Sequence, residues 1–156
     1  MEQQAVEILE QNRLMVLATV RSDGWPQTTF VGYANDDIDL YFAIFRGSQK
    51  FANIAAEPRV SIAIGAEPPD MRLARALYAG ARASEVKDPR ERDKAWDLLK
   101  HRHENLVGTP IPDAGAVAIM MAKCEHVSVL DYTKGLGHTK AFDVAIDKGR
   151  PAVGGK

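Results

Sequence analysis

The sequence predicts a mainly β protein of the α+β class, in which an antiparallel sheet closes fully or partly into a barrel. About six segments carry the β-branched and aromatic residues of strands, against two substantial helices and one short helix. Short polar turns join the first three strands, as in an antiparallel meander. The chain lacks the repeated strand–helix–strand order of a doubly wound sheet.

The first part of the chain supplies a helix and two strands. Apolar residues at helical spacing predict a helix of about three turns that ends near Asn12. Residues 14–20 are almost continuously apolar, which predicts a strand buried on both faces. A turn at residues 22–24 leads to a strand over residues 26–34, and residues 35–37 turn the chain again.

Residues 39–65 predict a strand, a tight turn, a short helix and a second strand. Ser48 is expected to cap the helix, and Pro58 ends it because a residue before proline is pushed out of the α region. Alternation in the first strand places three side chains on one face: Leu40, Phe42 and Ile44. The helix has an apolar stripe of Phe51, Ile54 and Ala55. The second strand alternates through Val60, Ile62 and Ile64.

A loop, a strand and the longest helix follow. Two adjacent prolines exclude regular structure from the middle of residues 66–75. Residues 77–86 predict a strand, and Gly80 in its interior indicates a bulge or a close backbone approach. Asp88, followed by proline, is the expected N-cap of a helix that runs to about Leu106.

The last strands are expected over residues 116–122 and 125–130. Residues 1–144 then make up a single domain, because no composition shift or internal repeat divides them. Residues 145–156 are rich in glycine, proline and lysine and predict a flexible tail.

Composition and charge limit the classes of function and the cellular location that we expect. A net charge of −1 over 156 residues provides no bulk attraction to nucleic acid or to an anionic membrane. The single cysteine, Cys124, excludes an internal disulfide and is typical of a reducing compartment. With no leader-like start and no apolar run of membrane-spanning length, the expected location is the cytoplasm.

The turn at residues 47–50 is the best candidate for a ligand site. A helix that begins there exposes unpaired backbone N–H groups and the positive end of its dipole, and Ser48 and Lys50 add a hydroxyl and an ammonium. These features predict an anion seat of the kind that holds a phosphate. The competing interpretation is an ordinary capped helix with a solvated lysine.

Other reactive side chains form no recognisable set. The sequence has no catalytic-triad, zinc-finger, P-loop or dinucleotide-binding pattern, and no metal site is expected. His101 and His103 diverge on the long helix and are interpreted as solvated. His126 lies in a strand and His138 in a late glycine-rich loop, while Cys124 is expected to be a small buried side chain.

The order of these pieces resembles the pyridoxamine 5'-phosphate oxidase-like family of FMN-binding split barrels, over roughly residues 5–135. The matching segments are LATVRSDGWPQTTFVGYANDDIDLYFAIFRGSQKFANIAAEPRVSIAIG and, further on, YAGARASEVKDP before a helix containing AWDLL. The resemblance implies a six-stranded antiparallel split β-barrel with flanking helices. It also implies a homodimer that binds two flavins at the subunit interface.

The resemblance also implies the cofactor-binding residues. They are Thr29, Phe30, Val31 and Gly32 on one strand, Ala43 and Ile44 on the next, Ser48, Gln49 and Lys50 at the phosphate, and Arg75 from the partner subunit. Close relatives of the true oxidase usually have arginine where this chain has Thr29 and Gln49, so two bidentate phosphate contacts are missing. Arg46 and Arg75 are candidates to replace that charge. The sequence also stops without the family's C-terminal substrate-binding segment, so the oxidase reaction is not assigned.

The leading hypothesis is an FMN-dependent oxidoreductase acting on an unassigned small molecule. Its catalytic residues are unknown, although Tyr132 and His138 are candidates for a group that closes over the flavin from the partner. One alternative is a deazaflavin (F420-type) reductase on the same barrel. The other is a non-catalytic flavin or haem carrier or sensor. Haem degradation, which the resemblance also admits, would need an axial ligand, for which His126 and His138 are the candidates.

Overall fold

The computed structural model describes residues 2–145, which fold into eight strands, three α-helices and three 3₁₀ helices. The helices are α1 (Glu2–Gln11), α2 (Gln49–Ala56) and α3 (Pro89–Arg102), and the 3₁₀ helices are Met71–Leu73, Glu104–Leu106 and Tyr132–Lys134. The strands are β1 (Leu14–Val20), β2 (Pro26–Gly32), β3 (Ala34–Asp36), β4 (Asp39–Phe45), β5 (Arg59–Gly65), β6 (Arg75–Glu85), β7 (Val117–Asp131) and β8 (Thr139–Asp143).

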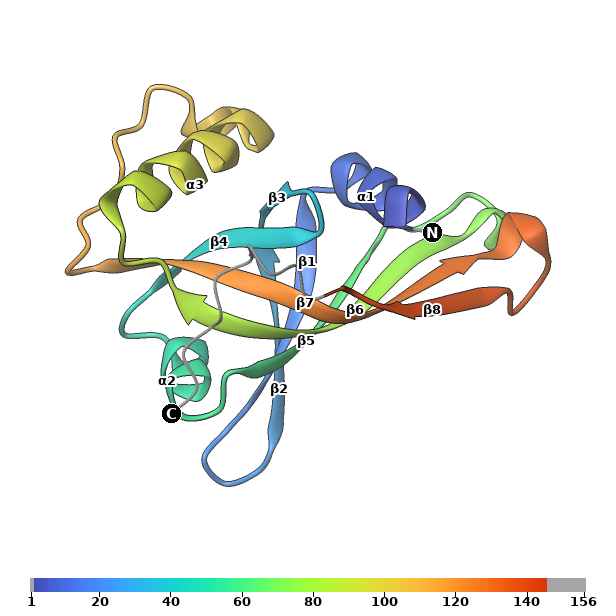
Figure 1. Ribbon diagram of the computed structural model, residues 1–156, viewed down its shortest axis with the longest axis horizontal. Helices are drawn as coiled ribbons and strands as arrows, with labels where there is room; N and C mark the ends of the chain where they lie inside the picture. Colours follow the sequence, from blue (N-terminus) through green and yellow to red (C-terminus); the bar gives the residue numbers. More distant parts are fainter. Residues whose placement is uncertain (1, 146–156) are drawn as a thin grey trace.

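All eight strands belong to one sheet, whose hydrogen-bonded order is β2-β1-β5-β6-β7-β4-β3, with β8 paired to β7. Every pairing is antiparallel. β2 and β3 lie at opposite ends of this order, yet only Tyr33 separates them along the chain. The sheet must therefore curl back on itself, which makes the half-barrel visible in Figure 1.

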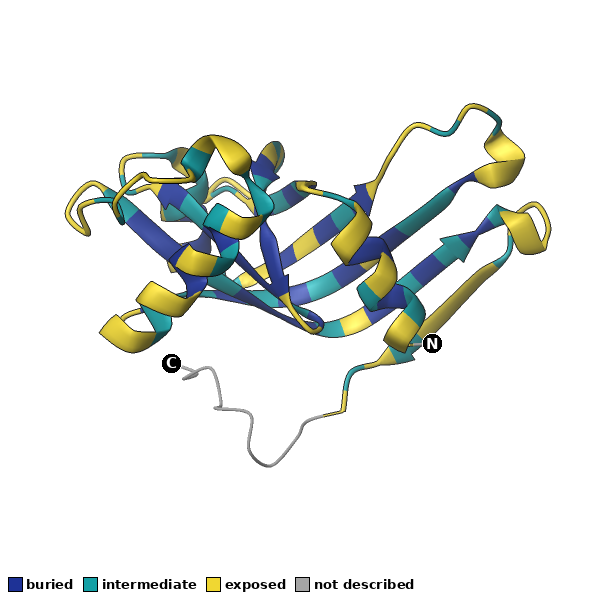
Figure 2. Cartoon of the chain, turned by 90° about the horizontal axis from the view of Figure 1, so that it is seen from above, coloured by how far each residue is buried: buried dark blue, intermediate teal, exposed yellow. Residues whose placement is uncertain are grey.

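Two apolar clusters hold the helices to the sheet. The larger one fills the inside of the curled sheet with side chains such as Leu17, Phe42 and Leu77. In the smaller one, Trp96 and Leu99 of α3 pack on the other face of the sheet, over β4 and β7. Figure 2 shows the middle strands banded with buried residues, whereas exposed residues gather on the helices, the loop tips and β8.

The predicted fold class is confirmed, but the strand count of six is wrong. The strand expected over residues 26–34 divides at Tyr33, whose backbone N–H donates to Arg13 O rather than to a neighbouring strand within the sheet. The two last predicted strands are a single long strand, β7, and Thr139–Asp143 adds β8. Its pattern was obscured because four of its five residues are exposed and supply no apolar alternation.

Most predictions from local sequence signals, such as caps and bulges, are confirmed. Gly80 marks the bulge between β6 and β7, where the register shifts between Gly80 and Ala81. Asp88 caps α3 by accepting a hydrogen bond from Arg90 N. The helix stops at Arg102, however, and residues 104–106 continue as a 3₁₀ turn instead of the predicted α-helix.

Two burial expectations were wrong. β1 is not buried on both faces in this chain, because Val16 and Ala18 on its outer side are only half-buried. In α2 the inward face carries Asn53 and Ile54, and Ala55 is exposed.

The membrane and tail predictions concern different parts of the chain. Within residues 2–145, no helix combines the length and the apolar character needed to cross a bilayer. The predicted flexible tail lies outside the described residues except for Ala145.

Candidate functional site

The turn between β4 and α2 has the geometry predicted for an anion seat. Ser48 has extended backbone angles, and its Oγ accepts a hydrogen bond of 3.3 Å from Phe51 N, which confirms it as the N-cap. The same hydroxyl donates to Phe45 O at 2.7 Å. The N–H groups of Gln49 and Lys50, in the first turn, have no carbonyl partner within the helix, so they remain available to a ligand.

Lys50 is the cation available at this turn. Among the described residues it makes no ion pair, and its side chain is partly exposed. Arg46, one of the two proposed replacement charges, instead pairs with Glu85 and donates from Nε to Ala114 O at 2.6 Å. The hydrogen bond from Arg46 lowers the pKa of the Glu85 carboxyl, against the opposing effect of burial. The Arg46 charge is thus largely neutralised within the fold.

Gln49 has a structural role that the sequence did not reveal. Its Nε2 donates to Asn53 Oδ1 at 2.8 Å. The Asn53 amide in turn donates to Thr19 Oγ1 and to Gln27 Oε1, each at 3.0 Å. Asn53 is 2% exposed, so this network fixes α2 against β1 and β2 beneath the turn. An asparagine in the middle of an apolar helical stripe was the only sequence signal for it.

A hollow of about 320 Å³ lies beside the same end of β4. It brings together three of the predicted cofactor residues, Gly32, Ala43 and Ile44. Trp96 and Leu99 of α3 also line it, and the rest of the wall is Phe45, His103, Asn105, Leu106, Pro112 and Val117. None of the described residues that line the hollow carries a permanent charge, so it suits an uncharged, largely apolar group.

The chain after α3 closes one side of this hollow. Trp96 Nε1 donates to Thr109 O at 3.2 Å, and Arg92 Nη2 donates to Pro112 O at 3.4 Å. With the bond from Arg46 to Ala114 O, three side chains therefore hold the backbone of this loop. Sequence reasoning left residues 107–115 out of the candidate site because their irregular composition has no periodicity.

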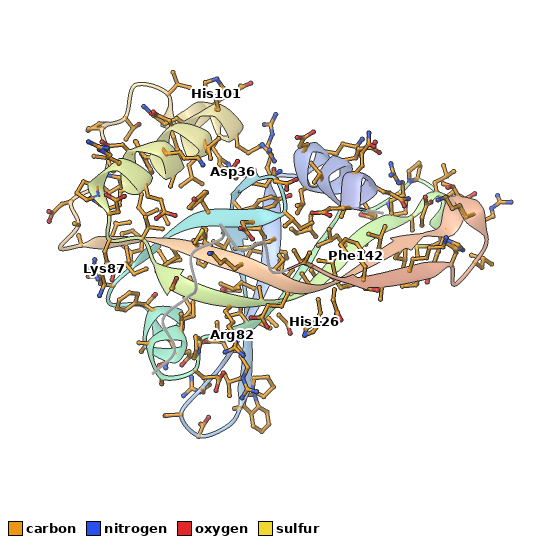
Figure 3. All side chains as sticks on the ribbon, viewed as in Figure 1. Asp36, Arg82, Lys87, His101, His126 and Phe142 are labelled. Atoms are coloured by element: carbon orange, nitrogen blue, oxygen red, sulfur yellow. The ribbon has the colours of Figure 1, made fainter. Side chains whose placement is uncertain are left out.

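His103 corrects the interpretation of the helix histidines. It is partly buried at the end of α3, and its Nε2 lies 2.9 Å from Tyr33 O. Its ring lies so close to Gly32 that a Cβ added there would stand 3.0 Å from His103 Cε1. His101, by contrast, is exposed on the outer side of α3, as predicted. Figure 3 shows His101 pointing away from the sheet.

The other three predicted residues of β2 do not line the hollow. Val31 is buried in the inner core, and Phe30 points outward and is 74% exposed. Thr29 faces inward beside Leu17, and its Oγ1 is buried with no hydrogen-bond partner among the described residues. Alternation along a strand explains the split, because successive side chains face opposite sides of the sheet.

Arg75 lies far from this turn within the chain. Phe45, just before the turn, pairs with Val117 at one end of β7, and Arg75 pairs with Asp131 at the other end. The intervening stretch of β7 corresponds to about 46 Å of strand at about 3.3 Å per residue. Tyr132 and His138 belong to the Arg75 end, since Tyr132 N donates to Ala74 O and His138 O accepts from Asp131 N. Figure 1 shows the two ends on opposite sides of the molecule.

A second hollow, of about 460 Å³, lies on the outer face of the sheet over β1, β5, β6 and β7. His126 lines it, and its Nδ1 lies 2.6 Å from Asp143 Oδ1 on β8. Figure 3 shows His126 projecting below β7, on the side opposite α3. In the described part of the chain, no group of three or more His, Cys, Asp or Glu side chains is arranged to hold a metal ion.

Comparison with known proteins decides the family. The sequence profile described as pyridoxamine 5'-phosphate oxidase matches residues 1–130. The chain belongs to this family. Comparison with curated protein sequences found no significant match.

Solved structures with the same fold carry different names. A putative pyridoxamine 5'-phosphate oxidase from Listeria innocua has a TM-score of 0.69 at 21% identity, over 83% of this chain and 97% of that one. A heme binding protein from Mycobacterium smegmatis has a TM-score of 0.78 at 18% identity, over 91% of this chain and 57% of that one. HutZ, a heme storage protein from Vibrio cholerae, has a TM-score of 0.66 at 17% identity, over 76% and 86%. At these identities the likeness shows the shared fold.

Proposed function

We propose that this member of the family is an oxidoreductase that binds FMN and acts on a small molecule. The observation that carries the proposal is the continuity of two features along β4. Ala43 and Ile44 border an uncharged hollow, and the same strand runs directly into the Ser48-capped turn with the amides of Gln49 and Lys50. The hollow borders the end of the strand, and the capped turn follows it directly, so a ring seat and a phosphate seat lie next to each other along the chain.

The residues present fit this cofactor in charge and polarity. Lys50 and the N-terminus of α2 would hold the phosphate, and the apolar wall of Ala43, Trp96 and Leu99 would hold the ring and exclude water from it. FMN would supply the electron-transfer chemistry when bound. A deazaflavin with a long acidic tail would need more cations, and the nearby Arg46 is already paired with Glu85. The free charge at the turn therefore favours FMN over F420.

The proposal includes a homodimer. Arg75, Tyr132 and His138 lie at the end of β7 opposite the phosphate seat, so they can contribute to a flavin site only from a second copy. The outer face of β2, β1 and β6 carries the exposed apolar side chains Phe30, Leu14 and Tyr78, which a second copy would cover.

Titration with FMN tests the proposal. The purified protein is expected to quench FMN fluorescence with a single binding transition, and Lys50→Ala is expected to weaken binding by about tenfold or more. Lys100→Ala is the matched control, since Lys100 pairs with Asp97 on the outer side of α3. An unchanged FMN affinity in Lys50→Ala would show that the turn is only a capped helix.

Haem binding is the second candidate, and a specific pair of residues favours it. Asp143 contacts Nδ1 of the exposed His126 imidazole and leaves Nε2 as the free ring nitrogen of a residue that lines the outer hollow; a carboxylate orients a metal-ligating histidine through such a contact. Two proteins with the same fold are named for heme binding or heme storage. On this candidate, the protein should shift and sharpen the Soret band relative to free haemin. His126→Ala should abolish this change, and the exposed-site control His101→Ala should retain it. The same change in His126→Ala would reject this haem site.

A further inference from the structure

We infer that His103 is the side chain through which the hollow beside α3 recognises its ligand, by a hydrogen bond at Nδ1 to the edge of a planar heterocycle. The inference rests on the proposed function, because the heterocycle is taken to be the flavin ring. His103 is the only titratable side chain among the described residues that line this hollow. It also supplies a polar group at a site that otherwise has apolar walls and one amide side chain, Asn105.

The contact with Tyr33 determines which nitrogen of His103 is free. A backbone carbonyl can only accept, so the 2.9 Å contact with Tyr33 O requires a hydrogen on Nε2. Nδ1 then accepts a hydrogen bond when the imidazole is neutral and donates one when it is protonated. Nδ1 has no protein partner among the described residues, so a ligand in the hollow would supply one.

The ring of His103 is held in place by packing as well as by this bond. Its Cε1 lies over Gly32, where a Cβ would stand 3.0 Å away in unusually tight contact, and Gly32 itself lines the hollow. The position therefore combines a glycine on β2 with a histidine at the end of α3. The contact with Gly32 thus fixes the orientation of the imidazole, and a planar ligand in the hollow would meet the edge of that ring at Nδ1.

The charged and titratable groups near His103 bond elsewhere. The Arg102 guanidinium turns toward α1, where it donates to Leu9 O and Asn12 O, and to Asn35 Oδ1. The Tyr33 phenol donates to Leu9 O, and Glu104 is exposed. No carboxylate of the described residues is hydrogen-bonded to His103.

Two substitutions separate the binding role from the structural role. The amide of His103→Gln can still donate to Tyr33 O through its Nε2, but it has no counterpart of the imidazole Nδ1. His101→Gln removes an exposed imidazole from the same helix and is the control. Each protein is titrated with FMN and with riboflavin, which has the ring but no phosphate, between pH 5.5 and 8.5.

We expect His103→Gln to weaken riboflavin and FMN binding by about tenfold and to remove the dependence of affinity on pH, while His101→Gln behaves as the wild type. Imidazole ¹⁵N spectra add a direct readout: riboflavin should shift the Nδ1 resonance of His103 and leave that of His101 in place. Wild-type affinity and pH dependence in His103→Gln would overturn the inference alone. Riboflavin binding that depends on His103, without any gain from the FMN phosphate, would support it and reject the proposed phosphate seat. Failure of the wild type to bind either flavin would overturn both.

Discussion

The contribution of a single side chain to the stability of this fold depends on which buried polar groups it hydrogen-bonds. Asn53 is the clearest case, because one amide bonds to Thr19, Gln27 and Gln49. It is nearly fully buried, so a substitution leaves desolvated partners without hydrogen bonds.

Asn53→Ala is therefore expected to lower the free energy of unfolding by about 2–4 kcal/mol, measured by urea denaturation. Gln49→Ala is the matched control, because it removes only the exposed end of the network and leaves both Asn53 donations intact. Its expected loss is below about 1 kcal/mol. Equal losses in the two variants would contradict a role for the buried amide.

The Arg46–Glu85 pair predicts a pH dependence of stability. Its hydrogen bond lowers the pKa of Glu85 in the folded state, so the carboxylate stabilises the fold above the ordinary carboxyl pKa. That contribution is lost as the pH falls through the lowered pKa. Glu85→Gln should therefore be less stable than the wild type at pH 7, and the difference should shrink toward pH 3.

Thermal unfolding at several pH values between 3 and 7 measures this difference. Glu67→Gln, at an exposed loop position, provides the reference for a carboxyl without such a hydrogen bond. A Glu85→Gln difference that stays constant with pH would show that the pair acts through packing alone.

At the scale of elements, two helices begin with side-chain caps that differ in their surroundings. Ser48 caps α2 at the proposed phosphate seat, and Asp88 caps α3 where Arg90 N donates to it. Replacing either residue by alanine is expected to cost about 1 kcal/mol of stability. Only Ser48→Ala should also weaken FMN binding, because its hydroxyl stands beside the free amides of α2.

Paired urea and FMN titrations of Ser48→Ala and Asp88→Ala check this expectation. If both variants lose stability and neither loses FMN affinity, the α2 cap supports the helix without taking part in the site.

For the whole molecule, the length of β7 places Lys50 and Arg75 at opposite ends of one chain. In the proposed dimer each site uses Lys50 of one copy and Arg75 of the other. Lys50→Ala and Arg75→Ala homodimers should each bind FMN weakly. Mixing the two variants under exchange conditions should restore one intact site per heterodimer.

FMN titration of the mixed sample therefore tests the shared site, with a stoichiometry near one per heterodimer as the expected result. Light scattering establishes the dimer in parallel. Mixed protein that binds no better than the separate variants would contradict a site shared between subunits.

Local signals in the sequence predicted much of the fold and some of the site. The alternation in β4 and β5, the Ser48 and Asp88 caps and the Gly80 bulge are all decided by neighbouring residues, so they could be recognised without the structure. The family resemblance placed Gly32, Ala43 and Ile44 in one site, and the structure brings these three into one hollow.

Other features depend on residues that meet only in three dimensions. β8 was missed because its strand character comes from pairing with β7 and not from its own exposed, polar residues. The prediction of a solvated His103 is wrong, since nothing in its helix shows that β2 ends beneath it.

The sequence by itself determined the strand and helix pattern, the capped turn at Ser48 and the family, because each depends on short-range order along the chain. The tertiary structure decided which side chains share a site. It joined the end of β2, the end of β4 and the end of α3 around one hollow and placed His103 in it. It also separated Arg75 from Lys50 by the length of β7. The physical reason is that a curled antiparallel sheet sets these distances through register and closure, which no local pattern encodes.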